Sequence, residues 1–180
     1  RLTEKIISKK PVNLTLVEID NDLLKNLNIK YSNNKKIKII KSDIMKFDFE
    51  GYYQLVISNL PYNISSQILA KLVLLENKPK LFILMFQKEF AQRLLEKKIN
   101  SINSLIRCFY DVKLSFNVSK NCFRPIPKVD SSVLLFSRKD KKLLREDEVN
   151  EFIVFKRNLF SHKRKSLKNL LRKYQIEKDF

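Results

Sequence analysis

Glycine is the residue type in which this sequence is most deficient. The 180-residue chain holds a single glycine, Gly51, whereas an average usage of about 7% would give about a dozen. Loops that wrap phosphates or nucleotides need several glycines close together, because their backbone adopts conformations that side chains hinder. Any glycine-rich nucleotide loop must therefore lie outside this sequence or not exist.

Cysteine, histidine and long apolar runs are also scarce. Cys108 and Cys122 lack CxxC spacing, and His162 is the one histidine, which excludes a Cys/His zinc cluster and gives no sign of a disulfide framework. The longest purely apolar run, 81–86, has six residues, far fewer than the roughly 20 of a membrane-spanning helix. The sequence therefore predicts a protein without metal or membrane segment, in a reducing compartment.

Acidic residues are heavily outnumbered by basic ones. The chain has 37 Lys and Arg against 19 Asp and Glu, a formal net charge of +18, while 44% of its residues are apolar. The apolar content is that of a globular domain. The charge indicates a polyanionic partner, with nucleic acid the leading candidate. The alternative is a compositional bias toward lysine and asparagine that only keeps the protein soluble.

Short apolar segments of strand length alternate with helical patterns over the first three quarters of the chain. The expected strands are 14–19, 38–40, 54–58, 81–86, 112–118 and 129–136, and the expected helices are 22–27, 65–75, 88–97 and 104–110. Ser65 and Ser66 are candidate caps for the second helix, and the unbroken apolar run 81–86 indicates a strand buried on both faces. This alternation predicts an α/β fold with a largely parallel sheet.

A change of composition follows the last predicted strand. Residues 138–145 are charged and lack apolar periodicity, whereas 148–174 keep helical spacing without proline or glycine. We therefore predict a main domain over 1–138 and a partial, helical C-terminal domain over 139–180. A basic stripe on one side of this helical region would suit the phosphates of structured RNA, or it is a solvated face. Its members are Arg157, Lys163, Arg164, Lys165, Lys168 and Arg172.

Polar side chains stand where three predicted strands end. Glu18, Asp43 and Asn59 hold these positions, and ligands of open parallel sheets bind outside the carboxyl ends of the strands. A carboxylate there can accept hydrogen bonds from a ribose diol or from an adenine amine. Each acidic residue alone is equally compatible with a helix cap or a turn.

The segment Asn59-Leu60-Pro61-Tyr62 is the most specific of these strand ends. An amide side chain and backbone carbonyls can accept hydrogen bonds from an amino group, and Pro61 contributes no N–H donor. Tyr62 offers a flat face on which a base can stack. The alternative is an ordinary strand-to-helix turn in which the proline sets the bend and the tyrosine fills a gap.

Five segments together resemble, in order and spacing, the successive motifs of ribosomal RNA adenine N6,N6-dimethyltransferases, the KsgA-type enzymes. They are Val17-Glu18-Ile19-Asp20, Ser42-Asp43-Ile44, Asn59-Leu60-Pro61-Tyr62-Asn63-Ile64-Ser65, Phe86-Gln87-Lys88-Glu89 and Phe123-Arg124-Pro125-Ile126-Pro127-Lys128-Val129-Asp130-Ser131. The related macrolide-resistance methyltransferases of large-subunit RNA typically carry Ile at the position of Leu60 and Asn at that of Asp130. Both residues favour the small-subunit branch.

The resemblance implies a Rossmann-like methyltransferase sheet whose first strand and glycine-rich loop are missing from this sequence. It implies S-adenosylmethionine as methyl donor, with Glu18 on its ribose, Asp43 on its adenine amine, Ile19 and Ile44 around the adenine ring, and Asn59 alongside. This sequence has Asn100-Ser101-Ile102 where the family usually has a Gly-Arg-Leu element. This difference puts an RNA contact or a loop conformation in doubt.

The same resemblance assigns the reacting groups. Asn59, Leu60, Pro61 and Tyr62 would form the catalytic loop, with Tyr62 and Phe123 stacking on the extruded target base. The expected partner is ribosomal RNA in a precursor of the small subunit, bound by a monomer in the cytoplasm or, alternatively, an organellar matrix. A large-subunit methyltransferase and a non-catalytic nucleic-acid-binding relative stay open as alternatives.

Overall fold

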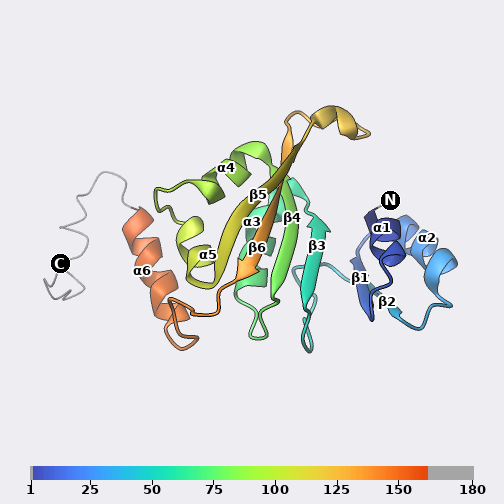
Figure 1. Ribbon diagram of the computed structural model, residues 1–180, viewed down its shortest axis with the longest axis horizontal. Helices are drawn as coiled ribbons and strands as arrows, with labels where there is room; N and C mark the ends of the chain where they lie inside the picture. Colours follow the sequence, from blue (N-terminus) through green and yellow to red (C-terminus); the bar gives the residue numbers. More distant parts are fainter. Residues whose placement is uncertain (1, 162–180) are drawn as a thin grey trace, which may run out of the picture. The chain divides into compact units, whose positions relative to one another are not determined.

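The computed structural model describes residues 2–161, which divide into two compact units with their boundary between Glu50 and Gly51 (Figure 1). The chain's one glycine thus begins the second unit. Its φ of 78° is in the left-handed region that side chains disfavour, and no atom lies within 4 Å of the position a Cβ would take. Backbone conformation rather than lack of space therefore calls for glycine here.

The first unit is a two-stranded parallel sheet with two helices. Its elements are α1 (Leu2–Ser8), β1 (Leu14–Glu18), α2 (Asn21–Tyr31) and β2 (Ile37–Lys41), and β1 pairs with β2 from Leu14 opposite Ile37 to Glu18 opposite Lys41. Helix α2 begins after Asp20, whose carboxylate accepts hydrogen bonds from the backbone N–H groups of Asp22 and Leu23, both at 2.9 Å. This cap satisfies donors that have no partner within the helix.

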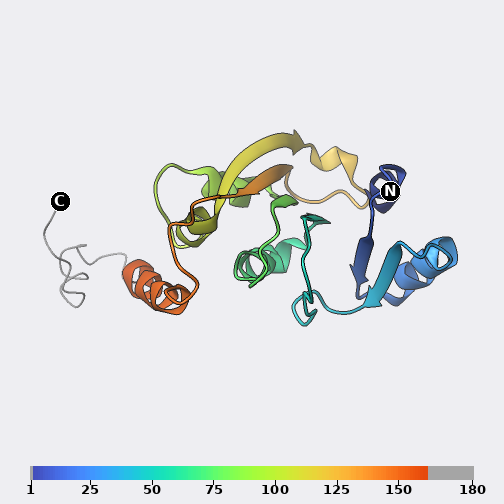
Figure 2. The ribbon, with the colours of Figure 1, turned by 60° about the horizontal axis from the view of Figure 1, so that its bottom comes forward.

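The second unit is built on a four-stranded mixed sheet with the strand order β3-β4-β6-β5 (Figure 2). Strands β3 and β4 are parallel, whereas β6 is antiparallel to both β4 and β5. The elements are β3 (Leu55–Asn59), η1 (Tyr62–Ile64), α3 (Ser65–Val73), β4 (Leu81–Gln87), α4 (Lys88–Leu95), α5 (Asn103–Phe109), β5 (Tyr110–Val118), η2 (Lys120–Cys122), β6 (Ser131–Arg138) and α6 (Val149–Ser161).

The core of the second unit lies on one face of its sheet. Phe82, Leu84 and Phe86 of β4 and Leu134 and Phe136 of β6 are all 0% exposed. The residues that alternate with them along β4 are only half-buried. The prediction that this strand is buried on both faces is therefore wrong within this unit, because both faces carry apolar side chains but only one is fully covered.

The described strands form two sheets, and β1 and β3 each pair along one edge only. The first strand that the resemblance implies to be missing stays a prediction. The alternating strands and helices confirm the predicted α/β class.

Two helices differ from the prediction. Helix α1 was not expected. Ser65 is not a cap but the first residue of α3, where its hydroxyl donates to the carbonyl of Tyr62 at 3.1 Å. Helix α6 confirms the start of the predicted C-terminal helix, and the predicted boundary at 138/139 stays a prediction. Within 2–161, no helix is long and apolar enough to cross a membrane.

Candidate functional site

The first unit brings its two predicted cofactor carboxylates to one edge of its sheet. Glu18 ends β1 opposite Lys41, and Asp43 follows β2 by two residues. The backbone N–H of Ser42 donates to the carbonyl of Glu18 at 3.1 Å, which continues the pairing past the strand end. The parallel register therefore places both acids at the carboxyl end of the pair.

Each carboxylate uses one oxygen to fix its own loop. Glu18 Oε1 accepts hydrogen bonds from the backbone N–H groups of Ile19 at 2.8 Å and Asp20 at 3.0 Å, and Asp43 Oδ1 accepts one from Met45 at 2.8 Å. Their second oxygens make no hydrogen bond to any residue in the described part of the chain. Each side chain is thus oriented by the backbone and still has an oxygen available to a ligand.

Apolar side chains stand next to both acids. Ile19, directly after Glu18, is 62% exposed, and Ile44, directly after Asp43, is half-buried. A carboxylate with an adjacent apolar surface suits a ligand that combines hydroxyl or amino groups with a flat ring. The acceptor oxygens and apolar side chains of the first unit therefore fit an adenosine group.

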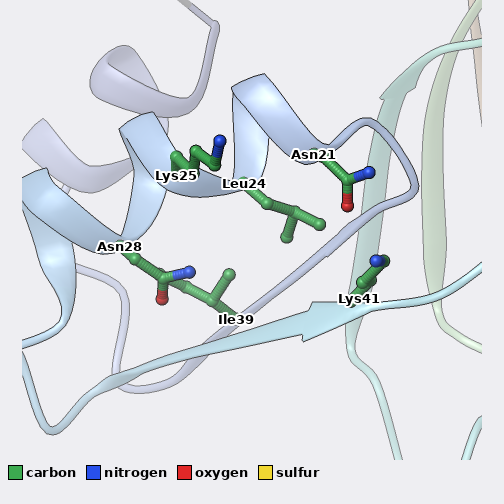
Figure 3. Close-up of a pocket in the computed structure, with 6 residues that line it drawn as sticks. All are labelled: Asn21, Leu24, Lys25, Asn28, Ile39 and Lys41. Carbon is green, nitrogen blue, oxygen red and sulfur yellow. The ribbon is translucent and has the colours of Figure 1, made fainter.

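A hollow of about 500 Å³ between α2 and β2 does not belong to this set. Its lining residues are Asn21, Leu24, Lys25, Asn28, Ile39 and Lys41. In Figure 3, Leu24 of α2 and Ile39 of β2 point toward one another across it. None of the four predicted cofactor residues of this unit lines the hollow, so it offers no support for the cofactor assignment.

The second unit presents free acceptors where β3 ends. Asn59 is exposed and Leu60 is 4% exposed. Neither the side-chain amide of Asn59 nor the backbone carbonyl of Leu60 hydrogen-bonds to another described residue. Pro61 follows in an extended conformation, with φ −63° and ψ 122°, before the turn of η1. The predicted loop thus offers two oxygen acceptors, with no competing donor from the proline.

Tyr62 is held at both ends. Its phenolic oxygen lies 2.6 Å from Ser131 Oγ, and its backbone carbonyl accepts the hydroxyl hydrogen of Ser65 at 3.1 Å. Ser131 is fully buried at the start of β6. Ser131 stands in the last of the five motifs, but nothing local in the sequence indicates its partner 69 residues away.

Phe123 belongs to a loop that closes on the same end of β6. The loop follows β5, contains η2 and has Phe123 half-buried after it. Asp130 Oδ1 accepts the backbone N–H of Lys120 at 3.0 Å, and the carbonyl of Asp130 accepts that of Lys88 at 3.0 Å. Tyr62 and the loop that carries Phe123 are therefore each hydrogen-bonded to one residue of the dipeptide Asp130–Ser131.

Asparagine side chains organise the segment that departs from the family pattern. Asn100 Oδ1 accepts the N–H groups of Ile102 at 3.0 Å and Asn103 at 2.9 Å, and the buried Asn103 amide donates to the Lys98 carbonyl at 3.0 Å. The carbonyl of Ser101 accepts a hydrogen bond from Lys156 Nζ of α6 at 2.8 Å. This loop between α4 and α5 is therefore organised without glycine and is hydrogen-bonded to α6.

The predicted RNA-binding stripe is described at one position only. Arg157 is exposed on α6. Its other members lie outside the described residues: Lys163, Arg164, Lys165, Lys168 and Arg172. Among residues 2–161, no group of three or more His, Cys, Asp or Glu side chains could hold a metal ion.

Comparison with known proteins gives consistent matches. A family model described as "Ribosomal RNA adenine dimethylase" matches residues 1–179. "Ribosomal RNA small subunit methyltransferase A" of Malacoplasma penetrans is 38% identical over 179 residues, which cover 94% of this chain and 63% of that protein. The mitochondrial small-subunit methyltransferase of Arabidopsis thaliana is 36% identical, covering 95% of this chain and 46% of its own length. The chain thus spans less than two thirds of these relatives.

Solved structures match the fold. A dimethyladenosine transferase from Plasmodium falciparum superposes with a TM-score of 0.78 at 28% identity, covering 88% of this chain and 59% of that one. The 23S rRNA methyltransferase ErmE gives a TM-score of 0.77 at 20% identity, with 96% and 71% covered. At that identity the second match supports the fold alone.

Proposed function

The chain belongs to the ribosomal RNA adenine dimethylase family, and from this premise we propose that it transfers methyl groups from S-adenosylmethionine to the N6 amine of adenines in small-subunit ribosomal RNA. The observation that carries the proposal is the pair of free acceptors, the Asn59 amide and the Leu60 carbonyl, at the end of β3 beside the anchored ring of Tyr62. The proposed product is dimethyladenosine, formed during ribosome assembly.

The acceptors address the low reactivity of an adenine amine. The N6 lone pair is delocalised into the ring, so the nitrogen is a poor nucleophile. If the Asn59 side-chain oxygen and the Leu60 carbonyl accept its two N–H bonds, the nitrogen becomes more tetrahedral and its lone pair is directed out of the ring plane. The proton becomes acidic only as the new bond forms, so positioning and fixed dipoles replace a strong base.

The first unit would hold the methyl donor. Glu18 would accept hydrogen bonds from the ribose hydroxyls and Asp43 one from the adenine amine, while Ile19 and Ile44 would cover the adenine ring. When bound, S-adenosylmethionine supplies a methyl group on an electrophilic sulfonium. The free second oxygens of both carboxylates support this assignment.

The target base must leave its stack to reach Asn59. Extrusion costs a few kcal/mol, which stacking on aromatic side chains offsets. Tyr62 and Phe123 supply those faces in the proposal. Arg157 and the basic residues that follow it in the C-terminal domain, 139–180, would bind RNA phosphates and so position the substrate. The proposed enzyme is a monomer that acts on a small-subunit precursor in the cytoplasm or in an organelle.

Two alternatives make different predictions. A large-subunit enzyme would methylate the other ribosomal RNA, but Leu60 and Asp130 and the names of the curated relatives favour the small subunit. A non-catalytic binder has no evident need for unpaired acceptors at this strand end, so the state of Asn59 and Leu60 favours an enzyme.

The test is to map methylated adenines. The full-length protein and its Asn59→Ala variant are expressed in a strain that lacks the small-subunit dimethylation, and both ribosomal RNAs are analysed by mass spectrometry. We expect dimethyladenosine in small-subunit RNA with the wild-type protein and a loss of at least about a hundredfold with the variant. Methylation confined to the large subunit would support the first alternative, and none in either RNA would support the second.

A further inference from the structure

We propose that Asp130 and Ser131 are positioning residues that together fix the two aromatic faces, Tyr62 and Phe123, between which the target adenine is held. This inference rests on the proposed function and extends it to two residues whose side chains do not belong to the catalytic loop. Tyr62 and the loop that carries Phe123 come from distant parts of the sequence, yet each is tied by a side-chain hydrogen bond to one of two consecutive residues.

The hydrogen bond to Ser131 restrains the Tyr62 ring. A tyrosine ring with a free hydroxyl can rotate and tilt about its side-chain torsions. Here the hydroxyl is hydrogen-bonded at 2.6 Å to a side chain that is 0% exposed, while the Tyr62 carbonyl is bonded to Ser65 at 3.1 Å. With its hydroxyl and its backbone both bonded, the ring is held in position and cannot swing away from this strand end before any base arrives.

The Asp130 half closes the loop that carries Phe123. The Asp130 carboxylate accepts the Lys120 N–H at 3.0 Å, which joins the two ends of the 120–130 segment around Phe123. The Asp130 carbonyl is in turn held by the N–H of Lys88, the first residue of α4. The loop therefore closes onto a position that the adjoining helix keeps in place.

The common anchor is rigid. Ser131 pairs with Gln87 of β4 and with Val118 of β5, so it stands inside the sheet rather than at its edge. Because Asp130 precedes it directly, the Cα atoms of the two anchoring residues are separated by one peptide unit. Catalysis by positioning requires such support, since small displacements of the reacting groups are costly.

The first experiment is a double-mutant cycle on the Tyr62 to Ser131 bond. Tyr62→Phe, Ser131→Ala and the double variant are assayed with small-subunit RNA and S-adenosylmethionine in the full-length protein. We expect each single variant to lower kcat about tenfold with KM changed less than twofold, because phosphate contacts dominate affinity. We expect the double variant to be no worse than either single one. Additive losses, or a change in KM alone, would overturn the proposal.

Asp130 provides a matched pair of variants. Asp130→Asn keeps the side-chain oxygen that accepts the Lys120 N–H, whereas Asp130→Ala removes it. We expect the first variant to retain wild-type kcat and the second to lose about tenfold at an unchanged denaturation midpoint. Equal kcat in both variants, whether high or low, would contradict the assigned role.

A spectroscopic readout separates positioning from general damage. The target adenine is replaced by 2-aminopurine, whose fluorescence is quenched when it stacks on an aromatic ring. We expect the quenching seen with wild-type protein to fall in Ser131→Ala and Asp130→Ala but not in Asp130→Asn, and unchanged quenching in all three would overturn the proposal. If the wild-type protein transfers no methyl group, the proposed function fails; if it does and all variants match it, only this inference fails.

Discussion

The ammonium group of Lys78 forms an ion pair with Glu146 at 2.8 Å although 68 residues separate them in the sequence. The lysine side chain is 1% exposed and the glutamate side chain 48%. Lys78 Nζ also donates to the carbonyl of Leu75 at 2.9 Å and lies 4.6 Å from the centre of the Phe109 ring. The segment between β6 and α6 is thereby fastened to the core through a buried charge.

Substitution of Glu146 and substitution of Lys78 should lower the free energy of unfolding by different amounts. Glu146→Ala leaves the buried ammonium without its counter-charge, and we expect the free energy of unfolding to fall by about 2 kcal/mol. Lys78→Met removes the charge together with its need for a partner, and we expect a smaller loss. Denaturant unfolding of both variants and of the exposed-site control Glu151→Ala measures the difference. Equal losses in the two variants would contradict this account.

The same pair predicts a dependence of stability on acid. Burial opposes ionisation of Glu146, but hydrogen bonds from Lys142 and Lys78 and their charges outweigh it and hold the pKa of the carboxyl below its ordinary value of 4.5. The contribution to stability is therefore present above about pH 4.5 and is lost as the pH falls through the lower native pKa. We expect the wild-type advantage over Glu146→Gln to shrink between pH 5 and pH 3, measured by denaturant unfolding.

The cofactor assignment predicts unequal effects of two substitutions at Glu18. Glu18→Ala removes both the bonds to the loop and the oxygen proposed for the ribose, and we expect binding of S-adenosylmethionine to weaken about a hundredfold or more. Glu18→Gln keeps one acceptor oxygen and should lose about tenfold. Isothermal titration calorimetry measures both, with Asp22→Ala on the exposed face of α2 as control. Wild-type affinity in Glu18→Ala would remove Glu18 from the cofactor site.

The exposed Arg157 makes a prediction about salt. If it contacts one RNA phosphate, Arg157→Ala should reduce the slope of log affinity against log salt concentration by about 0.7–0.9. Filter binding to small-subunit RNA over a range of salt concentrations measures the slope. Arg145→Ala is the matched control, because Arg145 is engaged with Asp147 and Glu148. An unaltered slope in Arg157→Ala would exclude such a contact.

The sequence predicts the elements of this fold better than it predicts their long-range partners. Strands such as Leu14–Glu18 and Leu55–Asn59 are visible because local apolar patterns specify them, and the polar residues at their ends mark the candidate site. Lys78 is different, since a lysine is expected at the surface and only the folded chain supplies the counter-charge that permits burial.

The bond between Tyr62 and Ser131 was missed for the same reason. Hydroxyl groups accept and donate in many settings, and nothing near either residue in the sequence indicates a partner 69 positions away. The local sequence pattern also could not predict that only one face of β4 is fully covered. An apolar run shows which side chains a strand can bury but not what packs against them.

The unpaired edges of β1 and β3 have a practical consequence. Within residues 2–161, each has backbone donors and acceptors along one edge that pair with no other strand, and along β3 these lie beside Leu55, Val56 and Ile57, which are exposed or half-buried. Apolar strand margins of this kind template intermolecular β-association. This chain is accordingly expected to associate as its concentration rises.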